Sequence, residues 1–180
     1  MTEPLVDLLK DIFGERCWDD SLEETAERVV SYWMEYAGND DKEFNLTTFP
    51  AGDIKQMIIV KDIEFVSLCA HHLLPFYGKA HVGYLPQDLM IGVSKIPRLV
   101  DHYAKRPQTQ ERLTHQIATD LKHALHAQGV GVVIESTHTC MACRGVHKPD
   151  AVMITNEFRG VFLTDPTPRE EFLHSIGRHE

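Results

Sequence analysis

The chain has 180 residues, of which 43% are hydrophobic and 25% charged, a balance typical of a soluble globular protein rather than a disordered or fibrous one. This length allows one well-packed core but not two ordinary domains, so we expect a single domain over residues 1–180. The formal net charge of −9 argues against general nucleic-acid binding, because that function needs a broad basic face.

Residues 1–43 are predicted to form a helical extension. A first helix is indicated by apolar residues at helical spacing that end near Gly14, namely Leu5, Leu8, Leu9 and Ile12. A second helix should begin after the capping pair Asp20-Ser21 and run through Trp33. The acidic, turn-rich segment 38–41 should end it.

From Phe44 onward the pattern changes to short runs of β-branched residues between turns, followed later by amphipathic segments. The predicted strands are 57–62, 78–85, 91–93, 130–136, 152–156 and 160–163. Helices are predicted at 96–103, at about 109–127, and after Thr167-Pro168. The fold class that follows is α+β, with one mostly antiparallel sheet and helices packed on one face.

Positive charges gather in one part of this acidic chain. Those between positions 95 and 112 are Lys95, Arg98, Lys105, Arg106 and Arg112, and Arg144 lies further along. A local basic cluster on an acidic protein suits a small anion such as a phosphorylated metabolite. A solvated helix face explains the same charges equally well, so both interpretations stay open here.

Two short motifs contain residue types that bind metals. Cys69 and His72 lie in Cys69-Ala70-His71-His72, and His138 and Cys140 lie in His138-Thr139-Cys140. Two thiolates with imidazoles suit zinc. A structural zinc site has four protein ligands, whereas a hydrolytic site has three and leaves the fourth position to water. Cys143 follows Cys140 in a C-x-x-C spacing, so it could be a fourth ligand. The sequence spacing leaves open whether it binds the metal or leaves the fourth position to water.

The cysteines also bear on the cellular compartment. The sequence starts without the basic segment and apolar run of a secretory signal, and its apolar runs are too short to span a membrane. Without a signal, cysteines next to histidines indicate metal binding rather than disulfides. We therefore expect a cytoplasmic protein.

Three blocks of the sequence resemble GTP cyclohydrolase I, in the order in which that family carries them. The first contains SLCAHHLLPF and GKAHV (67–82), the second IGVSKIPRLV and RPQTQERLT (91–114), and the third THTCMACRGV (137–146). One C-x-x-H motif would be weak evidence, but three long blocks in register are specific. The likeness extends from about residue 24 to the C-terminal helix.

The resemblance implies the tunnelling fold, which has a four-stranded antiparallel sheet with two long helices on one face, preceded by N-terminal helices. Residues 44–180 would form this catalytic core. It also implies a homodecamer with active sites at subunit interfaces. The reaction would convert GTP and water to 7,8-dihydroneopterin triphosphate and formate, the first step of pterin- and folate-type biosynthesis.

The resemblance also implies roles for individual residues. Cys69, His72 and Cys140 would bind zinc, and Cys143 would not. His138 would be the principal proton donor, assisted by His71. Imidazoles suit proton transfer because their ordinary pKa lies near neutral pH.

The substrate would be held by a second set of residues. Glu111 would accept hydrogen bonds from the N1–H and 2-amino group of guanine, which adenine cannot reproduce, and Gln110 would help to hold the base. The triphosphate would be bound by Ser94, Lys95, Arg98 and Arg144, whose three cations match its charge.

One departure from the family pattern lies next to a metal ligand. The family usually carries glutamate where this chain has Ala70, and loss of that carboxylate could change metal affinity or water activation. An alternative function is therefore a noncatalytic nucleotide- or pterin-binding homologue whose zinc is structural and closed by Cys143. The presence of both His71 and His138 argues against it, because a structural site needs neither.

Overall fold

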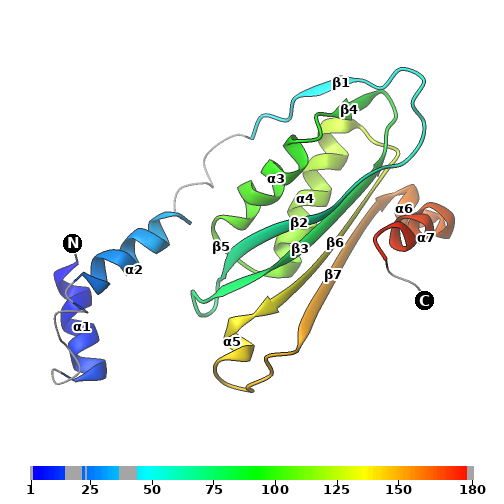
Figure 1. Ribbon diagram of the computed structural model, residues 1–180. Helices are drawn as coiled ribbons and strands as arrows, with labels where there is room; N and C mark the ends of the chain where they lie inside the picture. The colour runs from blue at the N-terminus through cyan, green and yellow to red at the C-terminus, as the bar shows by residue number, and fades with distance from the viewer. Residues whose placement is uncertain (1, 15–21, 23, 37–43, 178–180) are drawn as a thin grey trace. The chain divides into compact units, whose positions relative to one another are not determined.

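The computed structural model of the protein describes residues 2–14, 22, 24–36 and 44–177. The chain divides into two compact units, 1–38 and 39–180, which are considered separately (Figure 1). The first contains α1 (Glu3–Phe13) and α2 (Thr25–Met34), so two N-terminal helices are confirmed. The predicted capping pair Asp20-Ser21 and the predicted turn at 38–41 lie outside the described residues.

The second unit is built on a sheet in which four long strands are antiparallel, as predicted. Across the sheet the order is β5 (Pro107–Gln108), β2 (Ile58–Cys69), β3 (Pro75–Leu85), β6 (Gly129–His138) and β7 (Val152–Gly160). The short strand β5 pairs in parallel with the last two residues of β2. A separate two-stranded sheet joins β1 (Thr48–Pro50) to β4 (Leu89–Ile91).

Strand β2 is twice as long as the segment predicted at 57–62. The register with β3 shifts between Val60 and Ile63, and Asp62 at this bulge has a φ of 58°. After the bulge, Ile63 and Phe65 are buried while Glu64 between them is exposed. The predicted segment was too short for two reasons. One face of β2 is open to solvent and carries charged residues, and the bulge interrupts the alternation of buried and exposed residues.

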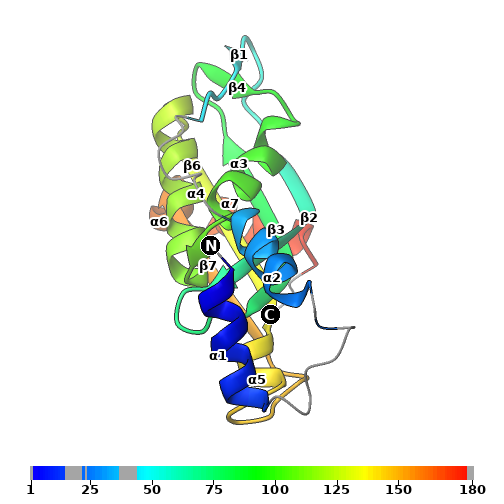
Figure 2. The same cartoon turned by 90° about the vertical axis from the view of Figure 1, so that its left-hand side faces the viewer.

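Helices α3 (Lys95–Ala104) and α4 (Gln110–Leu125) cover one face of the sheet (Figure 1 and Figure 2). Their buried residues, including Leu99, Leu113 and Ile117, form one core with inward-facing residues of the strands such as Phe76 and Val132. Both helices were predicted, and α4 was predicted from apolar residues at four-residue steps. In the part of the chain that the structure describes, no helix is long and apolar enough to cross a membrane.

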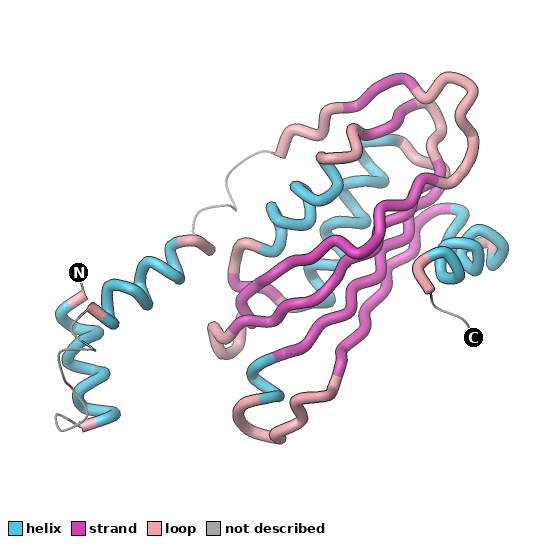
Figure 3. Tube along the Cα trace, viewed as in Figure 1, coloured by secondary structure: helices cyan, strands magenta, loops and turns pink. Residues whose placement is uncertain are grey.

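The strand predicted at 160–163 is wrong, because the chain turns from β7 directly into α6 (Val161–Thr164) and then α7 (Pro166–Ser175) (Figure 3). Gly160, at the turn, has a φ of 60°, which ends the extended strand. Phe162 and Phe172 then pack into a second core on the other face of the sheet. Within this apolar run only Phe162 is buried, and a short apolar run by itself does not distinguish a strand from a helix.

We expect Gly78→Ala to be strongly destabilising. A Cβ atom at residue 78 would lie 1.9 Å from the backbone oxygen of Glu135 on the neighbouring strand, so β3 and β6 would have to separate locally. We expect a loss of about 3 kcal/mol and a melting temperature lower by roughly 6–12 °C. Gly92→Ala is the control, since its Cβ would meet neighbours only at 3.5 Å or more. Equal melting temperatures for the two variants would contradict this prediction.

Candidate active site

The topology of the sheet brings the two cysteine-histidine motifs together. Strand β2 ends at Cys69 and β6 ends at His138, and both strands pair antiparallel with β3. Their carboxyl ends therefore lie at the same end of the sheet, where Phe76 pairs with His138. The short helix α5 (Thr139–Ala142) follows β6 directly and carries Cys140.

A tight turn after Cys69 presents the two adjacent histidines. The backbone N–H of Cys69 donates to the carbonyl of Leu74 at 2.8 Å, and the N–H of Leu73 donates back to Cys69 at 2.8 Å. Leu73 has a φ of 52°, so the chain reverses there. His71 and His72 lie within this turn and are exposed.

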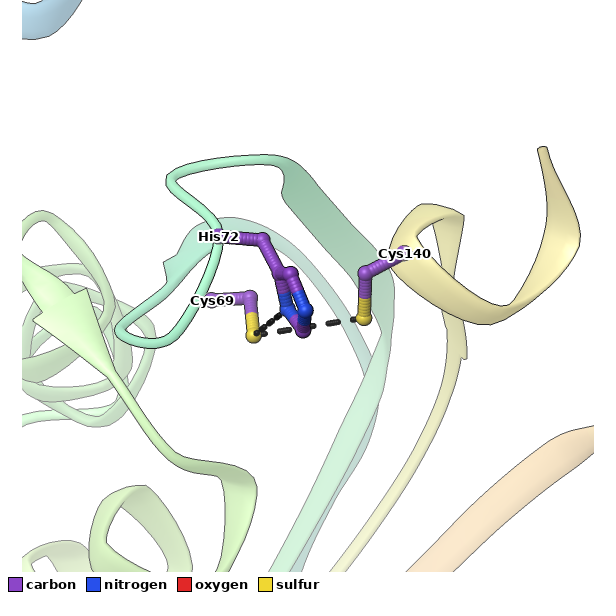
Figure 4. A group of neighbouring side chains, drawn as sticks. All are labelled: Cys69, His72 and Cys140. Atoms are coloured by element: carbon purple, nitrogen blue, oxygen red, sulfur yellow. Dashed lines mark hydrogen bonds between the residues drawn. The ribbon is translucent and has the colours of Figure 1, made fainter. Parts of the chain in front are cut away.

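Cys69, His72 and Cys140 converge into a group that could hold a metal ion (Figure 4). Their ligand atoms all lie within 4.8 Å of one another. The Sγ atom of Cys69 is 3.6 Å from Nδ1 of His72 and 3.9 Å from Sγ of Cys140. Among the residues that the structure describes, this is the one group of three or more potential ligands.

Cys143 is not a member of this group. Its side chain is exposed, and its Sγ donates a hydrogen bond to the carbonyl of Thr139 at 2.9 Å, one turn back along the chain. The arrangement thus has three protein ligands and room for a fourth, non-protein one. Burial raises the pKa of the Cys140 thiol, and the neighbouring Cys69 adds to the rise. A cation between the two sulfurs would oppose this rise and favour the thiolates.

His138 lies beside the metal-ligand group and is held on two sides. Its ring stacks on that of Phe76, with centroids 4.6 Å apart and planes 4° from parallel. Its Nε2 lies 2.9 Å from Oε1 of Gln110. Burial lowers the pKa of His138, and the carboxylate of Glu111 partly opposes that shift. The imidazole is therefore mainly neutral near pH 7 and able to take up a proton and return it.

A cavity of about 160 Å³ joins these side chains. It is lined by Cys69, His71, His72, Gln108, Thr109, Gln110, Glu111, His138, Cys140 and Met153. The predicted ligands, proton donors and base-binding residues therefore meet at one place. Gln110 lies at the bottom of this site, because only 1% of its surface is exposed.

The predicted triphosphate-binding residues do not all lie at this cavity. Ala104, at the last turn of α3, accepts a hydrogen bond from Ser67 near Cys69 at 2.6 Å. Lys95 begins the same helix and is thus about 14 Å away along its axis. Ser94 and Arg98 lie at that remote end, both exposed, and Lys95 donates to the carbonyl of Asn45 at 3.0 Å.

The predicted site residue Arg144 follows α5, on the metal-ligand side of the molecule, and is exposed. Two other cations of the basic cluster are engaged within the fold. Arg112 donates to the carbonyl of Pro107 at 2.6 Å, and Arg106 donates to the carbonyl of His102 at 2.9 Å. Because both arginines bind backbone carbonyls near the turn before α4, their role here is structural.

Several residues around His138 carried no signal in the sequence. Ser136 and Thr155 both hydrogen-bond the side chain of Gln110, and Phe76 supports the ring of His138. Their importance depends on the strand register. The alternation of side chains along β6 places Ser136 and His138 on one face of the sheet. It does not show that both contact Gln110 on α4.

The fold and the site together define an α+β protein in which three residues that could hold a metal ion line one cavity with His71 and His138. The sequence model of the family described as GTP cyclohydrolase I matches residues 2–177. GTP cyclohydrolase 1 of Methylococcus capsulatus (strain Bath) is 47% identical over 180 residues, covering 98% of this chain and 97% of the relative.

Two further relatives with the same name extend this similarity. The protein of Aquifex aeolicus (strain VF5) is 47% identical over 172 residues, which cover 95% of this chain and 92% of the relative. That of Rhodopirellula baltica (strain SH1) is 46% identical over 178 residues, which cover 98% of this chain and 78% of the relative. The chain belongs to the GTP cyclohydrolase I family, which confirms the resemblance. The predicted α+β class, with a mostly antiparallel sheet, is confirmed by the structure.

Proposed function

We propose that this protein is a zinc-dependent GTP cyclohydrolase I, which converts GTP and water to 7,8-dihydroneopterin triphosphate and formate. The observation that carries the proposal is a three-ligand group, Cys69, His72 and Cys140, next to His138 in one cavity. Family membership supports GTP as the substrate. The downstream use would be pterin- or folate-type biosynthesis, in the cytoplasm.

Zinc fits the two distances from the Cys69 sulfur to the other ligand atoms. Zinc–sulfur bonds of about 2.3 Å and a zinc–nitrogen bond of about 2.0 Å, at tetrahedral angles, separate two sulfurs by about 3.8 Å and sulfur from nitrogen by about 3.5 Å. The Cys69–Cys140 and Cys69–His72 distances are 3.9 Å and 3.6 Å. Two thiolates with one imidazole are also a ligand set that zinc prefers.

The chemistry divides between the metal and the histidines. A zinc ion held there would lower the pKa of a bound water to about 7, which supplies a nucleophile for opening a purine ring at C8. His138 is the principal proton donor to the ring nitrogen, and His71, whose Nδ1 lies 3.8 Å from Sγ of Cys69, assists. Mainly neutral near pH 7, His138 would first take up a proton and then deliver it.

Substrate recognition uses the rim of the cavity and a second subunit. Glu111 accepts from the N1–H and 2-amino group of guanine, and Arg144 binds the triphosphate. The cavity of about 160 Å³ in one chain is smaller than ordinary ligand sites, which span roughly 300–1,000 Å³. Ser94, Lys95 and Arg98 of a neighbouring copy would complete it, which requires a homo-oligomer, and a homodecamer follows the family pattern.

The noncatalytic alternative is less well supported. It requires Cys143 as a fourth ligand, whereas the Cys143 thiol donates to the carbonyl of Thr139. It also assigns no role to His138, whose ring is stacked on that of Phe76. The open ligand position and the partly buried imidazole of His138 together therefore favour the enzyme.

The first test is GTP turnover by the zinc-loaded protein, following formate and the dihydroneopterin product together, with Ala70→Glu in parallel. We expect both products from the native chain, because Ala70 is exposed and lies outside the ligand group. Ala70→Glu should change kcat by no more than about 100-fold, since changes in the groups that support metal ligands typically alter metal affinity or activity by 10- to 100-fold.

The two proteins together distinguish the possible outcomes. Turnover only in Ala70→Glu would mean that the scaffold is correct and that the missing carboxylate disables it. Absence of both products in both proteins, with zinc bound, would overturn the proposed activity in favour of a noncatalytic binder.

A further inference from the structure

The side chain of Gln110 makes a full set of hydrogen bonds within the protein. Its Nε2 donates to the carbonyls of Ile134 at 3.0 Å and Met153 at 3.1 Å, and to Oγ1 of Thr155 at 3.1 Å. Its Oε1 accepts from Oγ of Ser136 at 2.6 Å and lies 2.9 Å from Nε2 of His138. The two N–H groups of the carboxamide are therefore shared among three acceptors, and both lone pairs of its oxygen are occupied, so nothing remains for a purine base.

These bonds also determine which way the amide faces. The carbonyls of Ile134 and Met153 can only accept, so they must face the NH₂ group of Gln110. Oε1 therefore faces His138. Because an amide oxygen cannot donate, the hydrogen bond requires a proton on Nε2 of His138, which leaves Nδ1 as the other ring nitrogen.

The hydrogen-bond network around Gln110 spans three elements. Gln110 is the first residue of α4, and its partners lie on β6 and β7. Thr114, one turn further along α4, donates to the backbone carbonyl of Gln110 at 2.7 Å and lies 2.6 Å from Oγ1 of Thr155. A carboxamide anchored this way can hold a neighbouring ring in one orientation.

Resting on the proposed function, we infer that Gln110 is a positioning residue that acts through His138 and does not bind the base. With Phe76 stacked on the ring, Gln110 holds the imidazole in one plane with Nε2 turned toward the protein. Nδ1 is then the nitrogen that exchanges a proton with the substrate. The hydrogen-bond set replaces the base-holding role predicted for Gln110 from the sequence.

The inference is tested by combining Gln110→Met with His138→Ala in the zinc-loaded oligomer. In the native background we expect Gln110→Met to lower kcat by roughly 10- to 100-fold, with KM changed by less than about threefold. In the His138→Ala background, the same change should reduce kcat no further, because the residue that Gln110 positions is absent.

A binding measurement separates positioning from base recognition. His138→Ala removes the proposed proton donor, so the Kd of GTP can be measured by equilibrium dialysis with and without Gln110→Met. We expect the two values to agree within about twofold. A rise of tenfold or more, or an equal kcat loss in both backgrounds, would overturn the inference.

A second variant covers the case in which Gln110→Met fails to fold. Gln110→Glu keeps an oxygen toward Ser136 and His138 while giving up the donated bonds, so the Kd comparison can be repeated with it. Ser136→Ala is the matched control, because it removes a different bond to the same Oε1. We expect it to lower kcat less than about threefold, and a loss as large as that of Gln110→Met would contradict the inference.

Failure of this inference differs from failure of the proposed function. If the native protein releases no formate from GTP, the proposed activity is wrong whatever the variants do. If the native protein is active and Gln110→Met raises the Kd of GTP, only the positioning role is wrong.

Discussion

Cys140→Ala should abolish the zinc binding that we propose and lower GTP turnover by about 10³-fold or more, whereas Cys143→Ala should leave both within about twofold. The two cysteines are a matched pair, three residues apart, on and just after α5. Only the Sγ of Cys140 belongs to the group formed with Cys69 and His72. The thiol of Cys143 donates instead to the carbonyl of Thr139.

The measurement is zinc per chain, by elemental analysis after dialysis, together with formate release from GTP. An open three-ligand site predicts that only Cys140→Ala loses metal. Loss of zinc from Cys143→Ala as well would indicate a closed four-ligand site and favour the noncatalytic alternative. The melting temperature of each variant serves as the control for a general loss of fold.

Two variants that are each inactive should restore activity when they are assembled together. One is Cys140→Ala, which lacks the metal. The other combines Lys95→Ala with Arg98→Ala, which removes the two cations that we propose bind the triphosphate, at the end of α3 about 14 Å from the ligand side. If each active site uses the ligands of one copy and the cations of another, some mixed sites receive both intact halves.

The expected recovery follows from random mixing. With equal amounts of the two chains, about one site in four combines an intact metal centre with intact cations, so about a quarter of the native activity should return. The chains are coexpressed and purified through two different tags, and each homo-oligomer is assayed alone as a control. A mixed oligomer as inactive as its parents would contradict a site shared between subunits.

Much of the fold was predictable because its elements are encoded by local periodicity. Apolar residues at four-residue steps predicted α4, and short runs with β-branched residues between turns predicted most of β3 and β6. The bulge at Asp62 and the helical run after Gly160 escaped prediction for a common reason. In both places tertiary packing, rather than the local pattern, decides between a strand, a bulge and a helix.

The sequence by itself determined the family and the residue types of the site. Three blocks in register identified the family, and Cys69, His72 and Cys140 were predicted as ligands from the family pattern. Only the tertiary structure decided where the remaining side chains point. Cys143 turns to the backbone, Gln110 turns inward to His138, and Lys95 lies at the far end of its helix. These directions depend on hydrogen bonds and strand pairings between residues distant in the chain, whereas a motif records only residue type and spacing.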